Sequence, residues 1–221
     1  MQAEGSPADR LTSRWVVQDS TGREVVRGGG PLAVSACDPS ARQVAELAQD
    51  LPPGRYRVAL SVRGDRRRGL FRTEVELAPP APGISLSDLV PVCGDPSLIA
   101  QGGSVRLTAN IESRIPGEGP LVAYFEIYRL APDERGMARF EVEYTVRRLA
   151  EAGDRRSKKP RREPALLSSA SREEAQLAGI RRQFISVPVR SLAPGRYRLE
   201  VRVRDLVSGT QAEGAAAFTR E

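Results

Sequence analysis

The chain has 221 residues, of which 40% are hydrophobic, and it carries 34 Lys and Arg against 28 Asp and Glu, a formal net charge of +6. It is therefore long and apolar enough to bury a core. The sequence has no histidine and two cysteines, which excludes Ser–His and Cys–His nucleophile pairs, metal sites built on imidazole and four-cysteine zinc sites. We expect a chain that is not an enzyme and that binds no cofactor.

The first part of the chain predicts two hairpins. Residues 14–18 and 23–27 alternate between apolar and polar types and flank the turn residues 19–22, and residues 55–63 and 69–77 form a second such pair. Alternation with a period of two, bounded by turn residues, is typical of antiparallel strands. Between the hairpins, residues 40–48 carry a capping-box pattern, which predicts either a short helix or a loop.

A proline-rich segment divides the chain. Residues 78–83 read Ala-Pro-Pro-Ala-Pro-Gly, which fits neither a helix interior nor a central strand and favours an extended backbone. We therefore place a linker at residues 78–83, one domain at residues 1–77 and a second domain at residues 84–221.

The second domain predicts a further run of strands. They lie at residues 105–111, 121–128, 140–146, 183–189 and 210–218. The turn residues at 132–136 predict that 121–128 and 140–146 form a hairpin. Residues 171–179 repeat the capping-box pattern and again predict a short helix or a loop.

Both domains contain a similar segment, Leu-Pro-Pro-Gly-Arg-Tyr-Arg at residues 51–57 and Leu-Ala-Pro-Gly-Arg-Tyr-Arg at residues 192–198. In each copy a tyrosine, Tyr56 or Tyr197, follows a Pro-Gly turn and opens an alternating strand. This arrangement resembles the tyrosine corner of immunoglobulin-like sandwiches, so both tyrosines are predicted to be structural. We predict an all-β fold of two tandem immunoglobulin or fibronectin III-like β-sandwich domains, the first of them incomplete because it has fewer than about seven strand candidates.

Several segments, kept in one order, resemble the C-terminal region of bacterial GWxTD domain-containing proteins. They are residues 51–57, 68–77, 86–90, 122–128 and 196–209. The resemblance implies an extracytoplasmic bacterial protein, periplasmic, secreted or on the cell surface, whose β-sandwich region follows a separate N-terminal domain. The Gly-Trp-x-Thr-Asp motif itself is absent, since Trp15 lies in Arg-Trp-Val-Val, and residues 1–20 lack the apolar stretch of a signal peptide. Whether the chain is a fragment of a longer protein stays open, and no activity of the family's N-terminal domain is carried over to it.

The positive charge is concentrated in two tracts. Residues 63–72 contain five Arg and one Asp, and residues 153–164 contain six Lys or Arg with one Asp and one Glu. The cations that would contact a polyanion are Arg66, Arg67, Arg68, Arg155, Arg156, Lys158, Lys159, Arg161 and Arg162. No aromatic residue is interleaved in the second tract, and Pro160 and Pro164 indicate an insertion near residues 150–165, which favours a solvated loop and disfavours nucleic acid as a partner.

The cysteines leave two alternatives open. Cys37 and Cys93 lie on opposite sides of the linker, so a disulfide between them would restrict the motion of the two domains, whereas two free thiols would not. Spacing alone does not decide between these states, because bonding depends on the distance between the two Cα atoms.

These observations predict a non-catalytic binding or spacer module of an extracytoplasmic bacterial protein. Rigid sheets would present loops or an edge strand to a protein or glycan partner. The alternative is binding of a polyanion, nucleic acid or acidic glycan, through the basic loops at residues 63–72 and 153–164. Nowhere do 18 consecutive apolar residues predict a membrane span.

Overall fold

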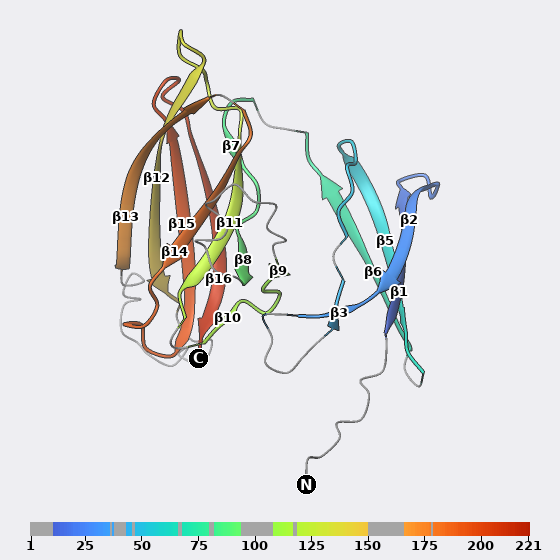
Figure 1. Cartoon of the computed structure of the whole chain (residues 1–221). Coiled ribbons are helices and arrows are strands. Elements are labelled where there is room, and N and C mark those ends of the chain that lie inside the picture. The colour runs from blue at the N-terminus through green and yellow to red at the C-terminus, as the bar shows by residue number, and fades with distance from the viewer. Residues whose placement is uncertain are drawn as a thin grey trace, which may run out of the picture. The chain divides into compact units, whose positions relative to one another are not determined.

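The computed structural model describes residues 11–35, 37, 43–45, 47–65, 68–79, 82–93, 108–116, 119–149, 166–177 and 179–221. The chain divides into two compact units, Met1–Pro80 and Ala81–Glu221, and each is described by itself (Figure 1). Every helix or strand element among the described residues is a strand, which confirms the all-β class. The assignment of each unit to the immunoglobulin or fibronectin III type stays a prediction.

Unit 1 is a four-stranded antiparallel sheet in the order β2-β1-β5-β6, accompanied by the two-stranded pair β3-β4. Its strands are β1 (Thr12–Asp19), β2 (Glu24–Pro31), β3 (Ala33–Val34), β4 (Gln43–Val44), β5 (Gly54–Arg63) and β6 (Arg68–Leu77). Both predicted hairpins, β1-β2 and β5-β6, are confirmed. In the first of them, Asp19 Oδ1 accepts hydrogen bonds from the amides of Thr21 at 3.0 Å and Arg23 at 3.1 Å, which fixes the turn.

The four-stranded sheet of unit 1 has one apolar face and one polar face. The strand register places Trp15, Leu60 and Phe71 in one row across β1, β5 and β6, because directly opposite residues in an antiparallel sheet point to the same side. A row on the other face pairs Arg57 with Glu74. Strand β6 lies at the edge of the sheet, and all of its residues except Leu77 are exposed.

Unit 2 contains two sheets. One has the order β10-β16-β15-β12-β13, and the other has the order β14-β11-β8-β9 with β7 also paired to β11. All of these pairs are antiparallel except β10-β16. The strands are β7 (Ser85–Leu86), β8 (Val90–Cys93), β9 (Thr108–Ala109), β10 (Arg114–Ile115), β11 (Leu121–Tyr128), β12 (Met137–Arg148), β13 (Leu166–Leu177), β14 (Arg181–Val187), β15 (Gly195–Asp205) and β16 (Gln211–Arg220). Residues 105–107, predicted to be strand, lie outside the described residues.

The two sheets of unit 2 enclose one hydrophobic core. Inward residues of β11, among them Phe125 and Ile127, and of β12 and β15, among them Phe140 and Val201, are buried in this one cluster. The alternation predicted for β15 places Tyr197, Leu199, Val201 and Val203 inside and leaves the intervening residues on the outer face. Unit 2 is therefore a two-layer β-sandwich whose outer surfaces carry the polar residues.

The hairpin predicted for residues 121–128 and 140–146 is wrong. Strand β11 pairs with β14, β8 and β7 in one sheet, whereas β12 pairs with β13 and β15 in the other. The chain crosses between the sheets at residues 129–136, where Arg129 has a φ of 60° and Leu130 is buried. The predicted turn closes within this connection, where the amide of Asp133 donates a hydrogen bond to Met137 O at 2.8 Å. Alternation indicates that a segment is a strand but does not indicate which sheet it joins.

The short helix considered for residues 171–179 is also wrong, because residues 171–177 belong to β13. This strand pairs with β12 from Met137 opposite Leu177 to Arg147 opposite Leu166, and such long-range pairing overrides the local capping pattern. In the segment 40–48, Gln43 and Val44 form β4 opposite β3, while residues 40–42 and 46 lie outside the described residues.

Candidate functional site

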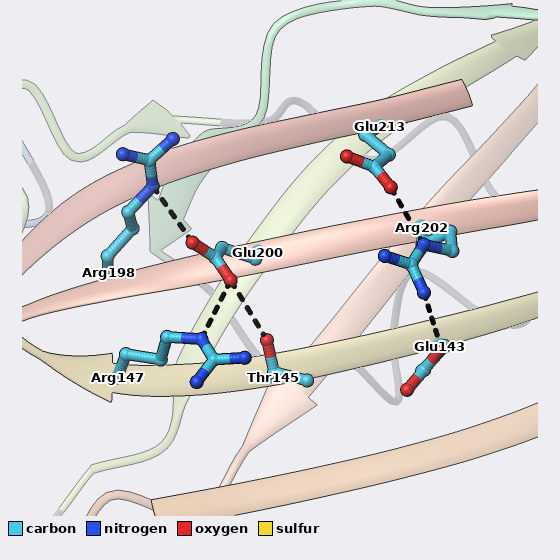
Figure 2. Close-up of polar contacts among 7 residues, drawn as sticks. All are labelled: Glu143, Thr145, Arg147, Arg198, Glu200, Arg202 and Glu213. Carbon is cyan, nitrogen blue, oxygen red and sulfur yellow. Dashed lines mark hydrogen bonds and ion pairs between the residues drawn. The ribbon is translucent and has the colours of Figure 1, made fainter. Parts of the chain in front are cut away.

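The most organised polar surface of unit 2 is the outer face of β12, β15 and β16, which we call the charged face (Figure 2). It consists of Glu143, Thr145, Arg147, Arg198, Glu200, Arg202 and Glu213. The strands position these side chains directly, since Thr145 lies opposite Glu200, and Arg202 lies between Glu143 and Glu213 in the register. Their apolar neighbours along each strand fill the core, so the backbone that holds the charged face is rigid.

Glu200 is the centre of one half of the charged face. Its carboxylate lies 3.1 Å from Arg147 Nε and 3.3 Å from Arg198 Nε, and it accepts a hydrogen bond from Thr145 Oγ1 at 3.3 Å. The Glu200 side chain is 38% exposed. Two guanidinium groups from neighbouring strands therefore flank one carboxylate that solvent can still reach.

Arg202 is the centre of the other half. Its Nε donates to Glu213 Oε1 at 2.8 Å, and its Nη1 lies 3.7 Å from Glu143 Oε2. The hydrogen bond and the charge of Glu213, with a smaller contribution from Glu143, raise the pKa of the Arg202 guanidinium. Arg202 is thus a fixed cation between two carboxylates, as Figure 2 shows.

An open depression of about 380 Å³ lies over these side chains. The seven residues of the charged face line it together with Val201, Gly214 and Ala215. On β16, Ala215 stands directly opposite Glu200, and its small side chain leaves room beside the carboxylate. The depression is therefore shallow, polar and walled by arginine side chains.

The ion pairs of the charged face are weak enough for a ligand to replace one of them. Each ion pair is solvent-exposed, and exposed ion pairs contribute little to stability because solvent screens them. Three Arg and three Glu also cancel in formal charge across the depression. A ligand can therefore replace one internal contact at small loss of stability, while the remaining contacts keep the side chains in place.

A second polar cluster lies on the outer face of β11. Glu126 accepts hydrogen bonds from the hydroxyls of Tyr124 and Tyr128 and lies 3.5 Å from Arg182 Nε. Tyr124 also contacts the ring of Phe184, with the centroids 5.1 Å apart. The Glu126 carboxylate is thus occupied by two hydrogen bonds and one ion pair, so we assign the cluster to stabilising the pairing of β11 with β14.

The pKa values of this second cluster follow from the shared hydrogen bonds. The bond from Tyr124 and then the bond from Tyr128 lower the pKa of Glu126, because both stabilise the ionised carboxylate. The bond to Glu126, followed by burial, raises the pKa of Tyr128 to about 12. The cluster is therefore a hydrogen-bonded carboxylate flanked by two neutral phenols at neutral pH.

Both predicted tyrosine-corner residues have the same local geometry. Tyr56 Oη donates to Pro52 O at 2.7 Å, and Tyr197 Oη donates to Ala193 O at 2.5 Å. In each case the acceptor lies four residues upstream, in the turn before the strand. Both side chains are buried, so they serve packing and are not placed to bind a ligand.

The structure does not bring the other sequence candidates together into a site. Arg68 is exposed at the first residue of β6, while Arg66, Arg67 and the basic tract with Arg155, Arg156, Lys158, Lys159, Arg161 and Arg162 lie outside the described residues. Cys37 and Cys93 are both disulfide-bonded, and neither is a free thiol.

Sequence reasoning did not find the charged face. The alternation of β12 predicts that Glu141 and Glu143 point away from the core, and they do lie on the outer face with Arg147. The arginines opposite them in the register, Arg204 and Arg202, come from β15, about sixty residues later in the chain. The signal that was present is the outward set Arg198, Glu200 and Arg202, in which opposite charges follow each other with a period of two.

The comparisons with known proteins identify no family. No family model and no curated protein matches the chain. Solved structures that align with it include a calcium-binding mutant of Bacteroides uniformis β-glucuronidase 2, with 13% identity and a TM-score of 0.32, and a Bacteroides uniformis β-glucuronidase, with 12% identity and a TM-score of 0.31. Each alignment covers 97% of this chain and 25% of the other, so this chain spans a quarter of their length.

Two further observations concern only the described residues. The described residues contain no helix with the length and hydropathy that a membrane span requires. They also contain no group of three or more His, Cys, Asp or Glu side chains placed to hold a metal ion.

Proposed function

We propose that the chain is a non-catalytic binding module of an extracytoplasmic bacterial protein, and that the charged face is the surface it presents to a protein or glycan partner. The observation that carries this proposal is the pairing of Glu200 and Arg202 with neighbours from three strands around an open depression. Side chains held in place before binding lose little conformational freedom when a partner arrives.

The chemistry of the charged face suits a partner with both donors and acceptors. Guanidinium groups donate to hydroxyl, carbonyl or carboxylate oxygens, and the carboxylates accept from hydroxyl or amide groups. Glycans and polar protein surfaces carry both kinds of group. A polyanion carries acceptors and negative charge only, and the three glutamates of the depression would oppose it.

The extracytoplasmic location is part of the proposal. Disulfide-bonded Cys37 and Cys93 support it, because disulfides persist mainly in oxidising compartments such as the periplasm or the cell exterior. The resemblance to the C-terminal region of GWxTD domain-containing proteins points the same way.

Reversing the charge of two arginines in the depression is expected to weaken partner binding. The purified chain would first be applied to a glycan array and to an array of purified bacterial envelope proteins. For each ligand found there, we expect the Arg198→Glu/Arg202→Glu variant to bind about tenfold or more weakly, equivalent to about 1.4 kcal/mol, in surface plasmon resonance. The reversal places carboxylates beside Glu200 and Glu213 and removes the donors that face the depression.

The same strand offers a matched control. Arg196 and Arg204 also point outward on β15 and are exposed, but they do not line the depression. The Arg196→Glu/Arg204→Glu variant has the same composition and net charge as the test variant and should keep the affinity of the wild type. Failure of the wild-type chain to bind anything on either array would contradict the binding proposal and leave the spacer role.

A further inference from the structure

Strand β6 presents a long edge without a partner strand. It forms the outer strand of the four-stranded sheet, and within the described part of the chain its free edge pairs with nothing. Leu70 is 65% exposed, Phe71 60% and Val75 39%. A ten-residue edge with exposed apolar side chains is a template for pairing with another strand.

We propose that this edge pairs antiparallel with β6 of a second copy of the chain, with Thr73 opposite Thr73 on the twofold axis. Two copies related by a twofold axis perpendicular to the sheet keep each face of the sheet on the same side. The apolar faces of the two unit 1 sheets then join into one surface, and their polar faces join into the other.

The sequence of β6 is complementary to itself in this register. Arg72 of each copy lies opposite Glu74 of the other, which forms two opposite-charge pairs on the polar face of the unit 1 sheet. On the apolar face, Phe71 of each copy lies opposite Val75 of the other. Opposite-charge pairs and pairs of aromatic with β-branched residues both stabilise antiparallel strands.

The rows already present in unit 1 continue across the proposed interface. Within one copy, Leu60 lies opposite Phe71, and Tyr56 lies opposite Val75. Pairing of Phe71 with Val75 of the second copy therefore extends an apolar row over four strands. On the other face, Arg57 lies 3.3 Å from Glu74 within one copy, and the next residue along that row is Arg72 of the second copy, so the charges alternate.

Each neighbouring register places a like-charge pair on the twofold axis, whereas the proposed register has no like-charge pair. A shift of two residues in one direction places Arg72 opposite Arg72 on the axis, and a shift in the other direction places Glu74 opposite Glu74. Like charges directly opposite each other destabilise a strand pair. In the proposed register, Arg68 lies opposite Ala78, so the basic hairpin tips of the two copies are at opposite ends of the paired strands.

The charges on β6 do not protect the edge against this partner. Charged side chains on edge strands commonly prevent association between sheets. Here both signs occur two residues apart on one face, as Arg72 and Glu74, and antiparallel pairing turns this spacing into attraction. An unrelated strand would lack the matching sequence, which is why a second copy is the partner.

Sedimentation-equilibrium measurements on the full chain over a range of concentrations test the proposal. We expect a monomer–dimer equilibrium, which Arg72→Glu weakens about tenfold because it creates two Glu–Glu pairs across the interface. The charge exchange Arg72→Glu/Glu74→Arg should restore the wild-type dissociation constant. A third variant, Arg57→Glu/Glu74→Arg, keeps the ion pair within one copy but creates two Arg–Arg pairs across the interface, and it should weaken the dimer as Arg72→Glu does.

Disulfide trapping tests the register. Cα atoms directly opposite each other in an antiparallel pair are about 4.5–5.5 Å apart, within the range that a disulfide spans. Thr73→Cys should therefore give a covalent dimer on mild oxidation. Val75→Cys should not, because the two residues at position 75 would be about 13 Å apart along the strands.

Several outcomes of these experiments would overturn the dimer proposal. A chain that stays monomeric at the highest concentration overturns the proposal, as does a dimer insensitive to Arg72→Glu or not restored by the charge exchange. Absence of the Thr73→Cys crosslink overturns it as well. None of these outcomes bears on the charged face of unit 2, since β6 belongs to the other unit.

Discussion

Replacing Asp205 with alanine is expected to lower the free energy of unfolding by about 3–5 kcal/mol. Asp205 is 1% exposed. Its Oδ2 accepts a hydrogen bond from the amide of Ala131 at 2.8 Å, and its Oδ1 accepts bonds from the amides of Val207 at 2.9 Å and Ser208 at 3.2 Å. The residue thereby links the crossover between the sheets to the turn after β15, and its loss leaves three amides without this acceptor. Urea denaturation followed by circular dichroism measures the loss.

Asp133→Ala is the matched control for Asp205→Ala. Asp133 Oδ1 also accepts from two amides, those of Arg135 and Met137, at 2.8 Å and 2.9 Å. Its turn is more exposed, so water can replace the carboxylate and the expected loss is about 1 kcal/mol. Equal losses in the two variants would contradict the role assigned to Asp205.

Acid titration gives a further check on Asp205. Burial by itself would raise the pKa of this carboxyl, but the hydrogen bonds from Ala131, Val207 and Ser208 outweigh it and hold the pKa below 3.8. A pKa that is lower in the folded state means that this part of the stability is complete above the ordinary Asp value and is lost as the pH falls through the folded value. The difference in stability between wild type and Asp205→Asn should therefore shrink below pH 3.8.

Truncation of Tyr197 is expected to be comparably damaging. Tyr197→Ala should lower the free energy of unfolding by about 4 kcal/mol, because the ring is 1% exposed and stacks on Phe218 with the centroids 5.4 Å apart. Tyr197→Phe removes only the hydrogen bond to Ala193 O and should lower it by about 1–2 kcal/mol. Chemical denaturation of both variants measures these values.

Tyr144→Phe provides the control for the hydroxyl. Tyr144 packs against the same core, and its hydroxyl makes no hydrogen bond to the described residues, so its removal should change the free energy of unfolding by less than about 0.5 kcal/mol. A loss at Tyr144 equal to that at Tyr197 would show that the corner hydrogen bond contributes nothing specific.

The parts of the fold that were predictable from sequence depend on neighbouring residues. The β1-β2 hairpin follows from alternating strands around a turn in which Asp19 caps two amides and Gly22 has a φ of 83°. The β5-β6 hairpin follows in the same way. In both, the strand, the turn and the partner lie within about twenty residues, so local pattern is sufficient.

The parts that were not predictable depend on which strands meet. Strands β11 and β12 are adjacent in sequence and both alternate, yet Leu130 is buried in the connection that carries the chain to the other sheet. The charged face is missed for the same reason. Glu200 becomes a partner of Arg147 only because β15 returns beside β12, and alternation within either strand carries no information about that pairing.

The central claim is that the charged face of unit 2 binds a partner through its depression. The most direct test is the ratio of the dissociation constants of Arg198→Glu/Arg202→Glu and Arg196→Glu/Arg204→Glu for one ligand, measured side by side at low and at physiological salt. The two variants have identical composition, so general charge effects cancel. We predict a ratio of about ten or more at both salt concentrations. A ratio near one would contradict the claim.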